Sequence, residues 1–230
     1  EFAMRYGNPS IPSLIKRMFE DDCWKIVCIP MYPQYASSTT GSVVDKIGDT
    51  LKVMRWQPTI RVSPPFYDDP QYIRILAQSV QTQIDALDET PDVLVASFHG
   101  VPKEYLLKGD PYHCQCQKTG RLLREALGWP EEKFKVAFQS RFGPKEWLKP
   151  YADELIEDLG HQGVKRVAVV SPAFFSDCVE TLEEIAIGLD ETFQEAGGKK
   201  LVALDCLNAS EDGMAVLEYL ARRELKGWLD

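Results

Sequence analysis

Residues 92–102 read DVLVASFHGVP, and this stretch decides the fold. Its apolar run at 93–96 is typical of a strand that is buried on both faces of a parallel sheet. The same pattern returns at 166–170, which reads RVAVV and is followed by Ser171 and Pro172. Both runs end in a polar residue next to a proline or glycine. The two segments therefore predict core strands of one sheet whose carboxyl ends open into loops at the same edge.

Weaker strands and longer amphipathic segments alternate on either side of these two runs. The weaker strand candidates are residues 25–30, 59–62, 134–138 and 201–204. Apolar residues near a 3.6-residue period predict helices at 71–87, 118–127, 147–159, 179–196 and 211–225. Strands that alternate with helices of this length indicate βαβ units and an α/β fold with a parallel sheet. A polar break at 88–91 suggests two domains, residues 3–88 and 89–230.

The composition excludes several classes of protein. The chain has 230 residues, 44% of them hydrophobic, and a net charge of -9. A pI near 5.0 argues against a general nucleic-acid binder. The longest apolar runs fall well short of the roughly 20 residues that span a bilayer, and no signal peptide is visible. Six cysteines without a CxxC pair predict reduced thiols in a cytoplasmic protein rather than a disulfide framework or a four-cysteine zinc site.

His99 is the first candidate for chemistry, because it follows the strand at 92–97 directly. The carboxyl end of a parallel strand is where open α/β sheets bind ligands. A histidine there can bind a metal or accept a proton at neutral pH. The alternative is a histidine whose ring is bonded to a loop carbonyl, and position alone does not separate the two.

A second candidate follows the strand at 166–170. Glu180 and Glu184 are four residues apart, so they share one face of a predicted helix and could relay protons or a hydrated cation. The alternative is structural, since Asp177 and Glu180 have the spacing of a capping box and acidic residues favour the first turn of any helix.

Three further segments combine polar and aromatic residues. Residues 138–148 could hold a flat anionic ligand, or Phe142 and Trp147 could fill the core beneath the sheet. Hydroxyls at residues 37–40 could cap a helix or bind an anion. His113, Cys114 and Cys116 could form a soft-metal cluster, although a turn that leads into a helix fits them better. No dinucleotide or P-loop signature is present.

Seven motifs, in this order along the chain, resemble the ferrochelatases of bacteria, and the resemblance covers nearly all of it. The motifs are RYG at 5–7, YPQY at 32–35 with STTG at 38–41, SFHGVP at 97–102, GDPY at 109–112, QSRFG at 139–143, WLxPY at 147–151 and DCVETLEE at 177–184. Ferrochelatases are lyases that insert Fe(II) into protoporphyrin IX in the last step of heme synthesis. The resemblance implies two chelatase-type (Rossmann-like) α/β domains with a porphyrin cleft between them.

The resemblance also implies roles for residues by position. His99 and Glu180 match the catalytic pair and, with Glu184, the metal site. Trp147 and Phe174 match aromatic residues of the porphyrin pocket. The opposite wall of that pocket corresponds to Arg5, Tyr6 and Tyr32. An imidazole can accept pyrrole protons and a carboxylate can bind ferrous iron, but the sequence does not assign these two roles between His99 and Glu180.

Departures from the family pattern lead to further predictions. Ser37 stands where animal members have a ligand of a 2Fe-2S cluster, so we predict no such cluster and no tightly bound cofactor. Cys178 stands where some members have histidine, which predicts that this position is not an essential ligand. The chain opens on Glu1 and Phe2, which resemble a cloning scar, and the strand expected at the start of the first domain is missing. The sequence therefore predicts a shortened chain with an incomplete first domain.

Two alternatives to iron insertion remain open at this point. The chain could be another tetrapyrrole chelatase, for example one specific for cobalt, or a fragment that binds porphyrin or metal without turnover. The predicted partners are protoporphyrin IX and ferrous iron, without nucleic acid. A peripheral contact with a membrane and the oligomeric state are left open.

Overall fold

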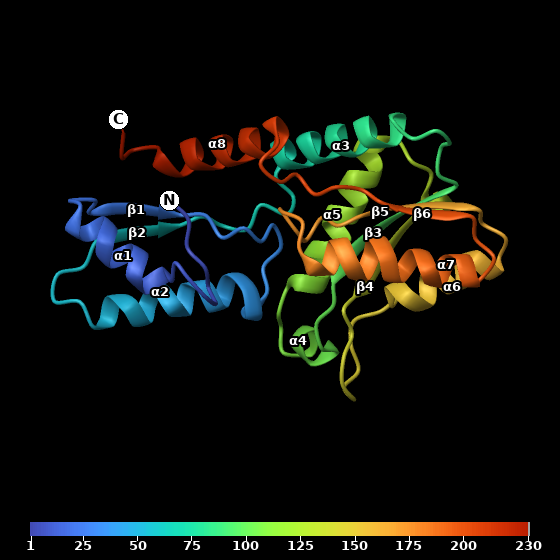
Figure 1. The fold of residues 1–230 in the computed structure, drawn as a ribbon. Coiled ribbons are helices and arrows are strands. Elements are labelled where there is room, and N and C mark those ends of the chain that lie inside the picture. The colour runs from blue at the N-terminus through green and yellow to red at the C-terminus, as the bar shows by residue number, and fades with distance from the viewer. Residues whose placement is uncertain (230) are drawn as a thin grey trace.

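The two strongest predicted strands pair side by side at the centre of a four-stranded parallel sheet (Figure 1). The computed structural model describes residues 1–229. The strand order is β4-β3-β5-β6, and every pair is parallel. The strands are β3 (Val93–His99), β4 (Phe134–Gln139), β5 (Arg166–Val170) and β6 (Lys200–Ala203). A second parallel sheet pairs β1 (Lys25–Cys28) with β2 (Thr59–Val62).

Helices cover both faces of the larger sheet. One face packs on α3 (Pro70–Asp85), α5 (Tyr112–Leu127) and α8 (Glu211–Leu225). The other face packs on α6 (Ala152–His161), the π-helix η3 (Glu180–Leu189) and α7 (Asp190–Glu195). Leu94 and Ala96 belong to the first core, whereas Val93 and Val95 belong to the second. This alternation places Ser97 and His99 on the face that η3 covers.

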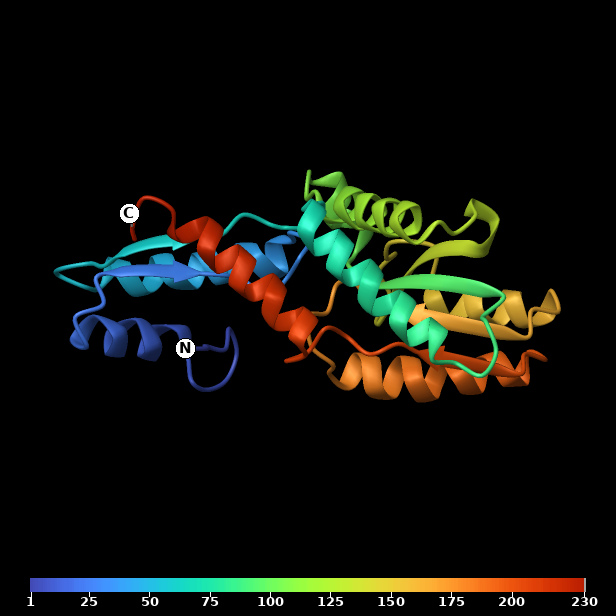
Figure 2. The same ribbon diagram turned by 90° about the horizontal axis from the view of Figure 1, so that it is seen from above.

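The smaller sheet packs on two helices near the N-terminus. These are α1 (Ile11–Glu20) and α2 (Ser42–Lys52), and α2 continues directly from a short π-helix, η1 (Ser37–Gly41). The core of this part contains Ile11, Ile15, Val43 and Ile47. Figures 1 and 2 show that α8 leaves the larger sheet beside α3 and runs back to the smaller one, where it contacts β1. The chain's last long helix thus joins both parts, and the predicted division at residue 88 stays a prediction.

Several element boundaries differ from the predictions. The predicted helix at 147–159 begins later, as α6, because Trp147 forms an antiparallel bridge with Pro102 and Pro150 precedes the helix. Conversely, α5 begins earlier than residue 118 and contains the His113–Cys116 segment. It ends as predicted at Gly128, whose φ of 68° is the left-handed conformation that glycine adopts most easily. Helix α1 was not predicted, and α2 was indicated only by the hydroxyls at 37–40 as a possible cap.

Three short segments complete the described elements. Helix α4 (Lys103–Leu107) follows the His99 loop, and a 3-10 turn, η2 (Glu131–Lys133), leads into β4. None of the helices within residues 1–229 is both long and apolar enough to cross a membrane.

Candidate active site

His99 is the last residue of β3, and its ring is oriented by the chain immediately after it. The Nδ1 atom lies 2.6 Å from the carbonyl oxygen of Gly100. A carbonyl oxygen only accepts, so Nδ1 donates and, in the neutral ring, Nε2 keeps its lone pair. No hydrogen bond to Nε2 is present in the described part of the chain. The loop-carbonyl alternative is therefore correct for Nδ1, and it leaves Nε2 available to accept a proton or bind a metal.

The loop after His99 depends on a glycine. A Cβ atom at Gly100 would lie 2.8 Å from the Gln139 carbonyl oxygen and 3.0 Å from the Trp147 ring. The Gly100 N–H donates to that same carbonyl at 2.8 Å, and the His99 carbonyl accepts from the Tyr112 hydroxyl at 2.8 Å. The backbone around His99 is thus held from both sides by close contacts that a larger residue would disturb.

Glu180 opens η3 beside His99. A hydrogen bond from the Cys178 thiol lowers the pKa of Glu180, partial burial opposes this, and the nearby charge of His99 lowers it further. Burial and the Glu180 carboxylate raise the pKa of Cys178, so the thiol stays protonated and can donate. Glu180 is consequently an ionised, half-buried carboxylate, and no lysine or arginine forms a salt bridge with it within residues 1–229.

Glu184, one turn further along η3, is engaged by Ser140. The Ser140 N–H donates to one carboxylate oxygen and the Ser140 hydroxyl to the other, each at 2.6 Å. Across the described chain, no group of three or more His, Cys, Asp or Glu side chains is arranged to hold a metal ion. The metal role predicted for Glu184 stays a prediction, and of the other predicted site residues His99 is the one that affects the pKa of Glu180.

The capping box predicted for Asp177 and Glu180 is not formed. The Asp177 carboxylate accepts from the Thr181 hydroxyl at 2.9 Å and from the Asn208 side-chain amide, while the Asp177 N–H donates to Asn208 rather than to Glu180. Asp177 therefore ties the loop before η3 to the loop after β6. This leaves the Glu180 side chain free of a capping role.

The predicted aromatic residues occupy different depths. Phe174 is half-buried, and its ring centroid lies 6.2 Å from that of His99. Trp147 is only 6% exposed and lies beneath Gly100, so it fills the core, whereas Phe142 beside it is 77% exposed. Of the two alternatives for this segment, core filling is correct for Trp147 and wrong for Phe142.

Arg5, Tyr6 and Tyr32 gather near α2, in the N-terminal part of the chain. The Arg5 guanidinium lies 4.4 Å from the Tyr6 ring centroid, and its Nε donates to the Ser42 carbonyl at 2.9 Å. Burial and nearby Tyr6 raise the pKa of Tyr32, while Arg5 acts the other way. The three residues form one cluster, but no hydrogen bond or ring contact within residues 1–229 joins them to His99 or Glu180.

Two other features lie away from this site. A cavity of about 470 Å³ is lined by α3 and α5 residues such as Ile73, Arg74 and Leu122. The soft-metal alternative for residues 113–116 is not supported, because Cys116 is fully buried, Cys114 is exposed and the His113 ring stacks on Phe138.

Two residues at the end of β4 belong to the site, although neither was singled out within the 138–148 segment. Gln139 and Ser140 contact Glu180 and Glu184, respectively. The available signal was a polar pair directly after an apolar strand, the same signal that singled out His99. Its meaning depends on the strand order, which places β4 next to β3.

Comparison with solved structures identifies the fold. SirB from Bacillus subtilis with Fe3+ superposes with a TM-score of 0.68 at 12% identity, covering 98% of this chain and 82% of that one. CbiX, the terminal enzyme for biosynthesis of siroheme in denitrifying bacteria, gives a TM-score of 0.55 at 15% identity, covering 88% and 77%. These likenesses and the two parallel sheets confirm the predicted chelatase-type α/β fold.

Sequence comparison identifies the family. The ferrochelatase of Rhizobium meliloti (strain 1021) is 55% identical over 229 residues, which are 100% of this chain and 68% of that protein. The ferrochelatase of Rhizobium etli (strain CIAT 652) is 56% identical and is covered to 67%. The family model named Ferrochelatase matches residues 1–225. With half or more of its residues identical to these enzymes along its whole length, the chain belongs to the ferrochelatase family.

Proposed function

We propose that this chain inserts Fe(II) into protoporphyrin IX to form protoheme, the last step of heme biosynthesis, and that His99 and Glu180 are its catalytic pair. The observation that carries the assignment is an imidazole with a free Nε2 at the end of β3 and an ionised carboxylate at the start of η3, joined through Gln139, which is the register partner of His99 and donates to the Glu180 carbonyl. Membership of the ferrochelatase family supports the reaction as a whole. The alternative of another tetrapyrrole chelatase is not favoured, since the solved SirB and CbiX are at most 15% identical.

The reaction requires a cation acceptor and a proton acceptor in one place. Ferrous iron displaces two pyrrole protons from the macrocycle as its four nitrogens bind the metal. The Glu180 carboxylate attracts the incoming cation, and the lack of a lysine or arginine partner within the described residues leaves its charge uncompensated. His99 accepts a pyrrole proton at Nε2, while its bond to Gly100 keeps the ring in place.

Other predicted residues complete the site in this proposal. Phe174, next to His99, forms one wall for the flat macrocycle, with Trp147 supporting the loop from below. Arg5, Tyr6 and Tyr32 form the opposite wall, and Glu184 extends the metal path along η3. We also propose that no 2Fe-2S cluster is bound, which iron and sulfide analysis with a visible spectrum tests.

The proposal is tested by anaerobic iron insertion with His99→Ala and Glu180→Gln. Each variant should lower kcat by about 10²–10⁴-fold, the usual worth of a positioned acid–base group. A parallel absorbance titration with protoporphyrin separates binding from turnover, and both variants should keep their porphyrin affinity. Unchanged turnover in His99→Ala would remove the proton-transfer role. Porphyrin binding without any insertion by the unmodified chain would instead favour a binding fragment.

A further inference from the structure

Gln139, the last residue of β4, connects the His99 strand to the helix that carries Glu180. It is 3% exposed and is the register partner of His99 across the β3–β4 pair. Its Oε1 accepts from the hydroxyl of Ser97, which is fully buried, at 2.7 Å. Its Nε2 donates to the main-chain carbonyl of Glu180 at 3.1 Å. One buried amide thus joins β3, β4 and the first residue of η3.

Ser140, the next residue, fixes η3 at a second point. Its backbone N–H and its hydroxyl donate to the two carboxylate oxygens of Glu184, both at 2.6 Å. The φ angle of Ser140 is 62°, a left-handed conformation that non-glycine residues adopt only when surrounding contacts hold it. The backbone is therefore held in an uncommon conformation in which both donors point at one carboxylate.

The helix that receives these contacts needs an external anchor. It is a π-helix over its whole length, and its N-cap residue, Val179, provides no side-chain cap. Val179 and Leu182 are 69% and 59% exposed, so packing holds η3 mainly through the opposite side of the helix. Hydrogen bonds from Gln139 and Ser140 therefore tie the first two turns of η3 to the end of β4.

We infer that Gln139 and Ser140, together called the β4 clamp, are positioning residues that set the separation of Glu180 from His99. The inference rests on the function proposed above for that pair. Gln139 fixes the backbone of Glu180 against the strand end that carries His99, and Ser140 fixes the next turn of η3 through Glu184. The β4 clamp touches neither iron nor porphyrin, and it acts on the rate through the geometry of the two catalytic groups.

The test compares Gln139→Met and Ser140→Gly with Gln83→Met. Methionine nearly matches glutamine in size but removes both hydrogen-bonding groups, and Ser140→Gly keeps the backbone donor while removing the hydroxyl. Gln83 also joins two segments, through two hydrogen bonds with the backbone of Asp205 and one to the Ser79 hydroxyl, and none of these reaches η3, so it is the control. The readouts are kcat and KM for porphyrin and for iron, the unfolding midpoint, and hydrogen exchange of the η3 amides.

Gln139→Met should lower kcat about 10- to 100-fold with KM for porphyrin within a factor of two, because a misplacement of about 1 Å costs up to this much. Ser140→Gly should lower kcat about three- to tenfold, since one of the two donors to Glu184 remains. Both should speed exchange of the η3 amides, which Gln83→Met should leave unchanged. Unaltered kcat per folded molecule, or unaltered exchange in η3, would overturn the inference.

These outcomes are separable from failure of the proposed function. If His99→Ala keeps full turnover while Gln139→Met still loosens η3, the β4 clamp exists but the catalytic pair is misassigned. In that case the positioning role is refuted along with the catalytic assignment of His99 and Glu180. The anchoring of η3 by Gln139 is still supported. Hydrogen exchange does not depend on turnover, so it tests the anchor even where iron insertion is slow.

Discussion

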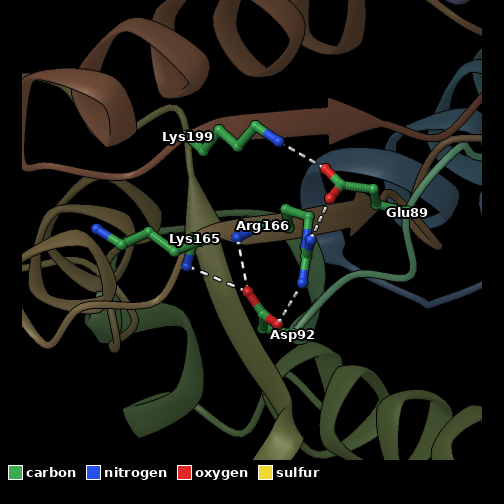
Figure 3. A network of polar contacts seen from close by, with 5 residues as sticks. All are labelled: Glu89, Asp92, Lys165, Arg166 and Lys199. Carbon is green, nitrogen blue, oxygen red and sulfur yellow. Dashed lines mark hydrogen bonds and ion pairs between the residues drawn. The ribbon is translucent and has the colours of Figure 1, made fainter.

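The two ends of the larger sheet are built from charged residues in opposite ways. At the amino end, acidic and basic side chains are paired, and Figure 3 shows Glu89 and Asp92 both bonded to Arg166. Lys199 pairs with Glu89 at 2.8 Å, and the Lys165 N–H reaches Asp92. At the carboxyl end, Glu180 has no basic salt-bridge partner among residues 1–229. The charged side chains at the amino end of the sheet thus form structural ion pairs, whereas at the carboxyl end the Glu180 carboxylate stays available.

This difference predicts which substitutions should affect stability and which should affect turnover. Loss of a paired group at the amino end should lower stability and leave turnover per folded molecule intact. Loss of a group near His99 or Glu180 should lower turnover out of proportion to stability. Three substitutions probe this contrast in addition to those described above.

Gly100→Ala should have the largest effect of the three. The added Cβ would lie 2.8 Å from the Gln139 carbonyl oxygen, which is main chain and cannot rotate away. The backbone must shift, at a cost of about 1–3 kcal/mol, and the shift displaces His99, which should lower kcat about 100-fold. Chemical unfolding and iron insertion measure the two effects.

Gly48→Ala is the matched control for this change. Gly48 lies inside α2, and a Cβ there would meet nothing within 4 Å. Alanine should therefore raise stability by about 0.5–1 kcal/mol and leave kcat unchanged. A Gly100→Ala protein with normal turnover would show that the tight loop after His99 is not needed for catalysis.

The contrast between the two sheet ends was only partly visible in the sequence. Strands β3 and β5 were predictable because their apolar runs are continuous, and His99 followed from its place after one of them. Helix α1 was missed although its sequence carries helix signals, a Ser10 cap, a proline in the first turn and apolar residues at 11, 14, 15, 18 and 19, because a strand was expected at the start of the chain. The contact between Gln139 and Glu180 joins residues 41 positions apart. It exists only because β4 and β5 flank β3, and hydrophobic patterning does not specify strand order.

Asp92→Asn should have an intermediate effect, confined to stability. Burial alone would raise the pKa of Asp92, but hydrogen bonds from the Arg166 N–H and guanidinium and from the Lys165 N–H lower it overall. A carboxyl whose folded pKa is depressed stabilises the protein above its unfolded pKa, and this contribution disappears as the pH falls through the folded value. At pH 7 the free energy of unfolding of the variant should be lower by about 1 kcal/mol. This value is reduced from that of a buried ion pair because the Asp92 side chain is 39% exposed.

The pH dependence is the sharper part of this prediction. Unfolding curves of the wild type and of Asp92→Asn should begin to converge as the pH drops below about 4, where the unfolded carboxyl becomes protonated, and should meet below the depressed folded pKa. Turnover per folded molecule at pH 7 should be the same for both. A constant gap in stability from pH 7 to pH 3 would mean that packing, rather than the charge of Asp92, holds this end of the sheet.

Lys199→Met should have the smallest effect, because it removes the most exposed of the ion pairs at the amino end of the sheet. The Lys199 side chain is 65% exposed, and its partner Glu89 keeps a second contact, at 2.8 Å, with Arg166. An exposed pair is screened by salt and loses side-chain entropy, so the unfolding midpoint should fall by about 1 °C or less at low salt. The matched control is Lys200→Met, because this exposed neighbour forms no salt bridge within the described chain. In 1 M salt the two variants should become indistinguishable, and a gap that persists there would show that Lys199 acts through packing rather than through charge.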